Sequence, residues 1–178
     1  MQYTFNTTEI FYYYMVKINT FLVLIEISSA SGQVKYEYKN GALHVDRFLS
    51  TSMIYPSNYG FVPNTLGGDG DPIDVLLHSS HPVIPGAMIK ARTIGGLLTE
   101  DESGEDIKIL ALPDKKIDAT LAHIEHYNQL PEIFLKQIEH FFAHYKDLEK
   151  NKWVKVKNWI GPDEAFSIIS NSVINEIK

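Results

Sequence analysis

Glycine and proline are concentrated in the middle of this 178-residue chain. Ten of the eleven glycines lie between Gly32 and Gly104, and five of the eight prolines lie between Pro56 and Pro85. Both residue types disfavour the interior of a helix, and both are frequent in turns. The middle of the chain is therefore predicted to form short strands and loops instead of long helices.

Strand-like patterns occur within this region and beside it. Residues 21–27 are aliphatic and β-branched, and residues 73–77 follow a Gly-Asp-Pro turn. Residues 34–45 alternate around Asn40-Gly41, a dipeptide that favours the tight turn of a β-hairpin. A further strand is predicted at residues 153–157.

Apolar residues take helical spacing towards the C-terminus. A main helix is predicted after Pro131, including Tyr145 and Lys146, and a C-terminal helix is predicted after Gly161-Pro162. The apolar stripes are Phe134, Ile138, Phe141, Phe142, Tyr145 and Leu148 in the first helix, and Phe166, Ile169, Val173 and Ile177 in the second. No linker or repeat interrupts the chain, so residues 1–178 are expected to form a single domain.

The composition excludes several classes of protein. Hydrophobic residues make up 44% of the chain, which is enough for a globular core at this length. The 16 basic and 22 acidic residues give a net charge of −6, so general affinity for nucleic acid or anionic lipid is not expected. The longest apolar stretch, Phe21 to Ile25, is too short to span a membrane. Without cysteine or a secretory signal, the protein is expected to be cytoplasmic.

Eight of the acidic residues are gathered in two short clusters. Neighbouring carboxylates raise one another's pKa unless a cation neutralises them, and a divalent metal does so most simply. The alternative is a solvated acidic turn, whereas an EF-hand is excluded because Asp74 stands where that motif needs glycine. The clusters are Asp69, Asp71 and Asp74, and Glu100, Asp101, Glu102, Glu105 and Asp106.

Isolated charges on the predicted strands also suggest a site. Glu26 interrupts an apolar run, so it needs a partner unless it faces water from an edge strand. An ideal Asn40-Gly41 turn pairs Lys35 with Asp46 and leaves Arg47 on the other face. Lys35 and Arg47 then converge only through a bulge, a wider turn or strong twist. The alternative for these hairpin charges is a solvated cross-strand ladder.

Three features near the C-terminus have ordinary explanations. Tyr145 continues an apolar stripe and is expected to pack with its phenol at the rim. His140 and His144 have helical spacing, but Phe141 follows His140 where a zinc-protease motif has glutamate. The lysines around Trp153 suit either a nucleic-acid surface or an amphipathic strand.

Taken in order, these residues resemble family I soluble inorganic pyrophosphatases of the bacterial type. The resemblance covers roughly residues 22–160, and seven motifs in one order do not arise by chance. Ser28 stands where that family has proline, and residues 1–20 match nothing in it, so they are treated as an atypical N-terminal extension. The motifs include Asp69-Gly70-Asp71-Pro72-Ile73-Asp74, Ile25-Glu26-Ile27, Lys35-Tyr36-Glu37, Val45-Asp46-Arg47-Phe48, Tyr55-Pro56-Ser57-Asn58-Tyr59-Gly60, Asp101-Glu102-Ser103-Gly104-Glu105-Asp106 and His144-Tyr145-Lys146-Asp147-Leu148-Glu149.

The resemblance implies a fold and an activity. The fold is an α+β, predominantly β architecture, with a small five-stranded OB-like barrel flanked by two or more helices. The activity is that of an inorganic diphosphatase, which hydrolyses pyrophosphate to two orthophosphates through a metal-activated hydroxide. Several Mg²⁺ ions are expected in each active site, with Mn²⁺ or other divalent ions as alternatives, and the expected assembly is a homohexamer.

The resemblance also implies a role for each site residue. Asp71 is the candidate general base, since no metal or substrate contact is assigned to it. The metal ligands are Asp69, Asp74 and Asp106, with Asp101 at a further ion and Glu26 and Glu37 in outer or accessory positions. The substrate-binding residues are Lys35, Arg47, Tyr59, Tyr145 and Lys146, supported by Tyr55 and Lys108.

Two other functions are compatible with the same fold. An OB-type module for nucleic acid needs a basic groove with stacking aromatics, whereas this chain places acidic clusters near the expected barrel mouth. An inactive scaffold is the third alternative, but every residue assigned to the chemistry is present. The activity therefore remains the leading hypothesis.

Overall fold

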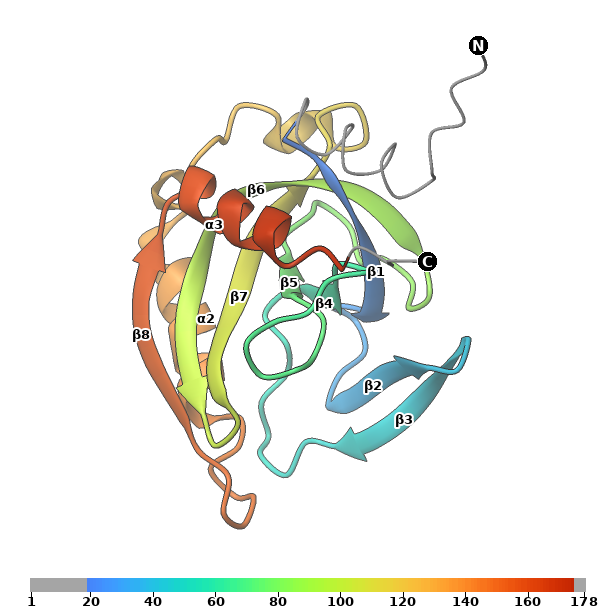
Figure 1. Ribbon diagram of the computed structural model, residues 1–178, viewed down its shortest axis with the longest axis vertical. Coiled ribbons are helices and arrows are strands. Elements are labelled where there is room, and N and C mark those ends of the chain that lie inside the picture. The colour runs from blue at the N-terminus through green and yellow to red at the C-terminus, as the bar shows by residue number, and fades with distance from the viewer. Residues whose placement is uncertain (1–18, 175–178) are drawn as a thin grey trace.

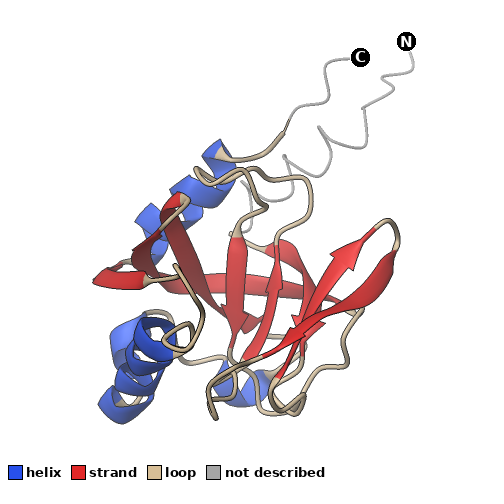
Figure 2. Cartoon of the chain, turned by 90° about the horizontal axis from the view of Figure 1, so that it is seen from below, coloured by secondary structure: helices blue, strands red, loops and turns tan. Residues whose placement is uncertain are grey.

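The computed structural model describes residues 19–174 of the chain. Most of its regular structure is β, as Figures 1 and 2 show. The strands are β1 (Phe21–Ile27), β2 (Val34–Lys39), β3 (Ala42–Phe48), β4 (Asn58–Phe61), β5 (Asp74–Leu77), β6 (Met88–Asp101), β7 (Gly104–Pro113) and β8 (Val154–Ile160). The helices are α2 (Glu132–His144) and α3 (Pro162–Asn171), with short 3₁₀ turns η1 (Ala119–Leu121) and η2 (Tyr127–Gln129).

Five strands close into a ring. Their order is β1-β4-β5-β7-β6, and β6 pairs back to β1 to complete it. β8 joins the sheet beside β6, while β2 and β3 form a separate hairpin. In Figures 1 and 2 this hairpin projects on the side opposite the two long helices. The expected five-stranded barrel flanked by helices is therefore confirmed.

The expectation of only short strands in the middle of the chain is wrong. β6 has 14 residues and β7 has 10. Gly95, with φ of +156°, lies at a bulge in β6, where a Cβ would stand 2.6 Å from the Tyr127 ring. Glycine here bends a strand instead of ending it. The bend lets one half of β6 pair with β1 and the other half pair with β8.

The barrel strands are buried on both faces. Successive residues of a strand point to opposite sides, so each strand contributes to two cores. One core lies against α2 and the other against α3. The first core includes Leu76, Leu110 and Phe142, and the second includes Val75, Ile109 and Ile169. This explains why residues 21–27 are apolar apart from Glu26, and they form β1 with the predicted bounds.

The main helix ends earlier than its apolar stripe predicts. α2 stops at His144, with Tyr145 as its C-cap, and Leu148 is 69% exposed. Lys146 also lies beyond the helix. The chain leaves helical geometry through successive tight turns, in which the Asp147 and Glu149 amides donate to the His144 and Lys146 carbonyls.

The C-terminal helix is shorter than predicted as well. α3 ends at Asn171, and Val173 forms an isolated β-bridge with Thr65. The predicted helical position Ile177 lies outside the described residues. The Leu66 amide donates to the Ser172 carbonyl at 2.8 Å, so the end of α3 anchors the loop between β4 and β5.

Membrane insertion through a helix has no support in residues 19–174. None of the helices described there has both the length and the apolar character that a bilayer span needs.

Gly60 is the position where the barrel leaves least room for a side chain. It pairs with Ile25, and an alanine Cβ would overlap the backbone carbonyl of Leu24. We expect Gly60→Ala to lower the free energy of unfolding by about 3 kcal/mol or more, because the backbone of β1 has to shift. Chemical denaturation measures this change. The control is Gly68→Ala, whose Cβ only touches the Glu105 carbonyl at 3.5 Å; equal effects of the two substitutions would contradict this packing.

Candidate active site

The loop that joins β4 to β5 carries the first acidic cluster and is pinned at both ends. Thr65 is 2% exposed, and its hydroxyl donates to the Val62 carbonyl at 2.6 Å and accepts from the Ile73 amide at 2.9 Å. Within the loop, the Gly67 amide donates to the Asp71 carbonyl at 2.7 Å. The loop is therefore a closed, hydrogen-bonded turn that holds its carboxylates in defined places.

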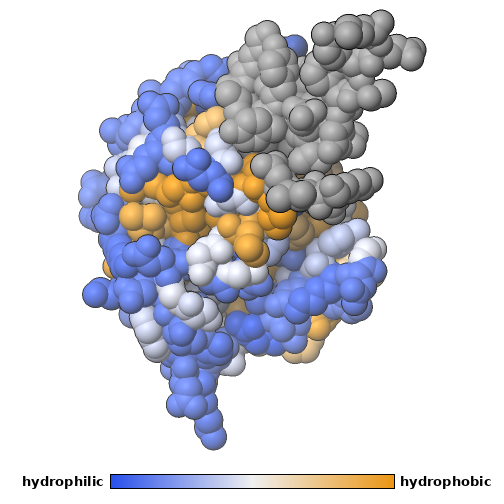
Figure 3. All heavy atoms as spheres, viewed as in Figure 1, coloured by the Kyte–Doolittle hydropathy of each residue, from blue (hydrophilic) through white to orange (hydrophobic). Residues whose placement is uncertain are grey.

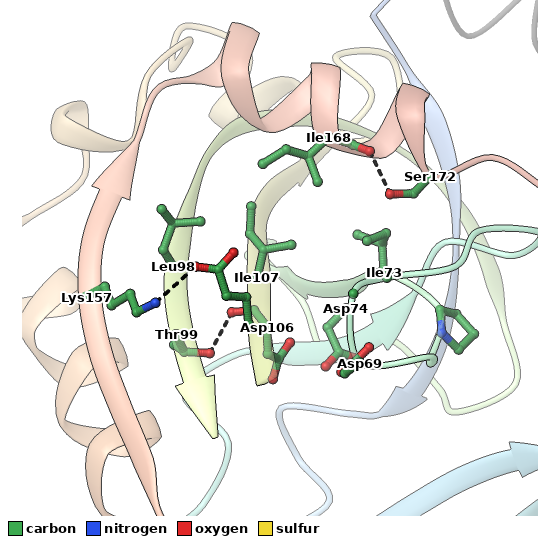
Figure 4. A pocket seen from close by; sticks show the side chains of 14 residues that line it. Asp69, Ile73, Asp74, Leu98, Thr99, Asp106, Ile107, Lys157, Ile168 and Ser172 are labelled. Carbon is green, nitrogen blue, oxygen red and sulfur yellow. Dashed lines mark hydrogen bonds and ion pairs between the residues drawn. The ribbon is translucent and has the colours of Figure 1, made fainter. Parts of the chain in front are cut away.

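A cavity of about 270 Å³ lies between this loop, the β6–β7 pair and α3. Four carboxylate residues line it: Asp69 from the loop, Asp74 from the start of β5, and Glu105 and Asp106 from β7 (Figure 4). The remaining lining is largely apolar, and Figure 3 shows apolar residues exposed on this face of the molecule near α3. The apolar lining residues are Pro72, Ile73, Leu98, Ile107 and Ile168.

Lys108 lies between two of these carboxylates. β5 and β7 run parallel with Asp74 opposite Lys108, and Asp106 precedes Lys108 by two residues on the same face of β7. The ammonium donates to Asp74 Oδ2 at 2.5 Å and forms a second ion pair with Asp106 Oδ2. With Lys108 only 5% exposed, a buried cation bridges the acidic pair.

Burial dominates the electrostatics of this group. It raises the pKa of the Asp106 carboxyl to about 6, with the Lys108 charge opposing the shift and the Asp74 charge adding to it. Burial alone would lower the pKa of Lys108, but the charges of Asp74 and Asp106 outweigh it and the net shift is upward. Because burial disfavours the ionised form of this carboxyl, a nearby cation stabilises that form strongly.

Glu26 is held at the edge of the same group. Burial raises its pKa to about 7, while the Tyr38 amide, which donates to Glu26 Oε1 at 2.6 Å, acts in the opposite direction. The charge of Asp74 raises this pKa further and the charge of Lys35 lowers it. The partner that the sequence requires for Glu26 is therefore a backbone amide of the β2–β3 hairpin.

The hairpin brings Lys35 and Arg47 together. The Asn40-Gly41 turn forms as predicted, but the register shifts so that Lys35 pairs with Arg47, and Asp46 becomes the extra residue of a bulge. Asp46 then binds both cations, at 3.1 Å from Lys35 Nζ and 2.5 Å from an Arg47 guanidinium nitrogen. A bulge was one of the three features, with a wider turn and strong twist, that could bring Lys35 and Arg47 to the same face.

Two neighbouring carboxylates hold these cations in turn. Lys35 Nζ is 3.1 Å from Glu37 Oε1, and Arg47 Nε donates to Glu149 Oε1 at 3.1 Å. The sequence analysis assigned no role in the site to Asp46 or Glu149, although both lie inside quoted motifs. That position within the motifs is the only signal that could have found them.

Three tyrosines form one aromatic cluster beside these charges. The Tyr55 ring lies 5.0 Å from Tyr59 and 4.7 Å from Phe141, and Tyr145 stacks on Phe141 at 5.1 Å. Burial raises the pKa of both Tyr55 and Tyr59, and the Lys108 charge lowers that of Tyr55. The phenols of Tyr55 and Tyr59 therefore stay neutral at neutral pH and can serve as hydrogen-bond donors.

The second acidic cluster lies at the β6–β7 turn and faces lysines. Lys146 Nζ donates to Asp101 Oδ2 at 2.8 Å, and Lys152 pairs with Glu102. Lys157 of β8 pairs with Glu100 and Glu105 at 3.0 and 3.1 Å. Because two of the lysines near Trp153 are neutralised in this way, the amphipathic-strand interpretation is favoured over a nucleic-acid surface.

Asp71 differs from its acidic neighbours. It is exposed and does not line the cavity, although its amide donates to Asp69 Oδ1 at 3.1 Å. Glu37 first and Asp71 more weakly raise the pKa of Lys39 in the hairpin. Gly70, with φ of +90°, provides the left-handed turn that separates the directions of Asp69 and Asp71.

The carboxylates suit a hard divalent cation by their chemistry. In residues 19–174, no three acidic or histidine side chains already converge on the position of a single ion. At the centre of the site, the Lys108 ammonium lies between Asp74 and Asp106 and occupies the place where an ion could bind both carboxylates. All donors here are carboxylate oxygens, which favour Mg²⁺ or Mn²⁺ over softer ions. By their donor chemistry these carboxylates therefore fit such a cation.

The structure thus gathers the predicted residues into three adjoining groups. The charges of Asp74, Lys108 and Arg47 all act on Tyr55, and Tyr145 is connected to Tyr55 through the Phe141 ring, so the groups adjoin one another. Of the predicted residues, Asp69, Asp74 and Asp106 line the cavity itself. The groups are Asp69, Asp74 and Asp106 with Lys108 and Glu26 next to them, Lys35, Glu37 and Arg47 on the hairpin, and Asp101, Tyr145 and Lys146 near the β6–β7 turn, with Tyr55 and Tyr59 in the aromatic cluster.

Comparison with known proteins gives consistent matches. A family model described as Inorganic pyrophosphatase matches residues 23–176. The inorganic pyrophosphatase of Rickettsia bellii is 53% identical over 153 residues, which are 85% of this chain and 87% of that protein. A solved inorganic phosphatase from Anaplasma phagocytophilum is 49% identical with a TM-score of 0.86, covering 88% of this chain and 93% of that one. A solved inorganic pyrophosphatase from Coxiella burnetii is 47% identical with a TM-score of 0.85, covering 88% and 94%.

The Thr65 hydroxyl offers a test of how the acidic loop is held. Thr65→Val keeps the shape of the side chain but leaves the Val62 carbonyl and the Ile73 amide without their buried partner. We expect the free energy of unfolding to fall by about 2 kcal/mol. Thr65→Ser retains the hydroxyl and is the control. If denaturant titration gives the two variants the same stability, the hydroxyl does not pin the loop.

Proposed function

The chain belongs to the inorganic pyrophosphatase family, and on that basis we propose that it hydrolyses pyrophosphate to two orthophosphates with the help of divalent cations, Mg²⁺ in the first place. One observation supports the proposal most directly. Carboxylates from three separate segments line one cavity, and the Lys108 ammonium pairs with two of them. Pyrophosphate is a polyanion that needs both kinds of group, since metal ions and protein cations share its charge.

Asp69, Asp74 and Asp106 are the proposed metal ligands. Asp101 is the proposed ligand of a further ion, and Glu26 and Glu37 take outer or accessory positions. When bound, divalent cations neutralise charge on pyrophosphate and activate water as hydroxide near neutral pH. The pKa of Asp106, about 6 in the absence of metal, supports a cationic partner for that carboxylate.

Asp71 is the proposed general base. It forms no ion pair within residues 19–174, so its carboxylate is available to accept the proton of the attacking water. Its backbone is fixed on both sides, by the Gly67 amide and by the Asp69 carboxylate. A base held by its backbone on a closed turn keeps its position while the proton moves.

The cations and phenols are the proposed substrate clamp. Lys35, Arg47 and Lys146, each paired with a carboxylate in this structure, would exchange that partner for phosphoryl oxygens. Arg47 presents a planar, two-pronged donor, which a lysine cannot replace. Donors fixed on strands stabilise the charge that develops on the leaving phosphate without reorganising. Tyr55, Tyr59, Tyr145 and Lys108 complete the proposed clamp.

We also propose that copies of the chain assemble, as a hexamer by resemblance to bacterial members of the family. An open groove between residues 52–56 and α2 supports self-association. Ile54 and Ile133, which line it, are 55% and 65% exposed. Exposed apolar side chains gathered in one groove are typical of a surface that is covered by a partner.

Phosphate release from pyrophosphate tests the activity and the base together. The wild-type protein is expected to release phosphate with Mg²⁺ and to lose release when a chelator is present. Asp71→Asn is expected to fold and to bind Mg²⁺ as the wild type does, but to lose about 10²-fold or more of its turnover, because the amide cannot accept the proton.

Three different results would contradict the role of the divalent cations, the activity and the role of Asp71, one each. Release that is unaffected by the chelator would exclude the divalent cations, and no release with Mg²⁺ would exclude the activity. Near-wild-type turnover of Asp71→Asn would remove Asp71 as the base. Asp163→Asn, an exposed position in the first turn of α3, serves as the matched control and is expected to keep its turnover.

A further inference from the structure

Lys108 is the most deeply buried charge at the centre of the site. Its ammonium lies between Asp74 Oδ2 and Asp106 Oδ2 and sits 5.9 Å and 5.7 Å from the ring centroids of Tyr59 and Phe142. Surface lysines keep their ammonium in water, whereas this one has exchanged water for two carboxylates and two rings. Such an arrangement is stable only because opposite charges surround it.

The sheet forces this cation and the two carboxylates together. Parallel pairing sets Asp74 opposite Lys108, and alternation along β7 places Asp106 on the same face as Lys108. The carboxylates therefore cannot separate without breaking the β5–β7 ladder. In a buried place two such charges repel strongly unless a cation stands between them.

The charge of the whole group is not balanced by Lys108. Asp69, Asp74 and Asp106 together carry three negative charges when ionised, and the ammonium supplies one positive charge. The charge of Asp69 also contributes to raising the pKa of Asp106. The group thus keeps an excess of two negative charges, and it attracts a dication even with the lysine in place.

From this geometry we propose that Lys108 is an internal cation which occupies the Asp74–Asp106 pair in the metal-free protein and competes with a divalent metal for that pair. The inference rests on the proposed function in one respect, namely that Asp74 and Asp106 are metal ligands. A metal that takes over the two carboxylates releases the ammonium for a phosphoryl oxygen. Metal binding and substrate binding are therefore coupled through the Lys108 side chain.

The test compares Mn²⁺ binding by the wild type and by Lys108→Met, which keeps a side chain of similar length and removes the charge. Calorimetric titration is expected to show about tenfold tighter binding of the first Mn²⁺ to Lys108→Met, because no ion pair has to be broken. In chelator the same variant is expected to melt below the wild type, and saturating Mn²⁺ is expected to narrow that difference.

Lys157→Met is the matched control. Lys157 lines the same cavity and also bridges two carboxylates, Glu100 and Glu105, but neither is a proposed metal ligand, so this variant removes a nearby charge without freeing the Asp74–Asp106 pair. Its Mn²⁺ affinity is expected to equal that of the wild type. If Lys108→Met does not fold in chelator, folding upon addition of Mn²⁺ supports the proposal, and failure to fold with Mn²⁺ overturns it.

The remaining outcomes separate this inference from the proposed function. Unchanged or weaker Mn²⁺ binding by Lys108→Met, with normal binding by the wild type, shows that the lysine does not compete with the metal. Tighter Mn²⁺ binding by both Lys108→Met and Lys157→Met also overturns the proposal. The loss of any nearby positive charge would then explain the higher affinity. Absence of Mn²⁺ binding by the wild type contradicts the metal site itself.

Discussion

The parallel pairing of β5 with β7 is the constraint on which the site depends. It places Asp74 beside the buried Lys108 and leaves Asp106 on the same face. Like charges held this closely need a cation, and the fold provides one of its own. The pairing is in turn fixed by burial on both faces of the barrel, with Val75 and Ile109 in one core and Leu76 and Leu110 in the other. Hydrophobic packing thus holds two carboxylates close together despite their repulsion, and a divalent cation can bind between them.

The surrounding elements bring further charged side chains to this centre. The β2–β3 hairpin carries Lys35 and Arg47 on one face, and the turns after α2 carry Lys146. Each of these cations is balanced by a carboxylate within the described structure, so the metal-free site is a network of internal ion pairs. Partly exposed pairs of this kind contribute little to stability, which makes them easy to exchange for a ligand of higher charge. The arrangement therefore suits a substrate that arrives with its own neutralising cations.

Local signals predicted much of this architecture, and long-range pairing accounts for the rest. Asn40-Gly41 predicted its hairpin because a two-residue turn is encoded by its own backbone preferences, with φ of +54° and +79° at these residues. The apolar run of β1 predicted its strand for a similar local reason. The length of β6 was not predicted, because only the packing of Tyr127 against Gly95 shows that the strand bends there and continues. The roles of Lys108 and Glu149 depend on partners 34 and 102 residues away in sequence, so spacing along the chain gave no direct sign of them.

The central claim is that the carboxylates gathered by β5, β7 and the intervening loop form a site for hard dications. Anomalous diffraction from crystals grown with Mn²⁺ measures this directly, since it locates the ion without reference to activity. The account predicts an anomalous peak in the cavity with oxygens of Asp69, Asp74 and Asp106 turned towards it. Crystals that contain Mn²⁺ at other positions only, with these side chains turned away from the cavity, would contradict it.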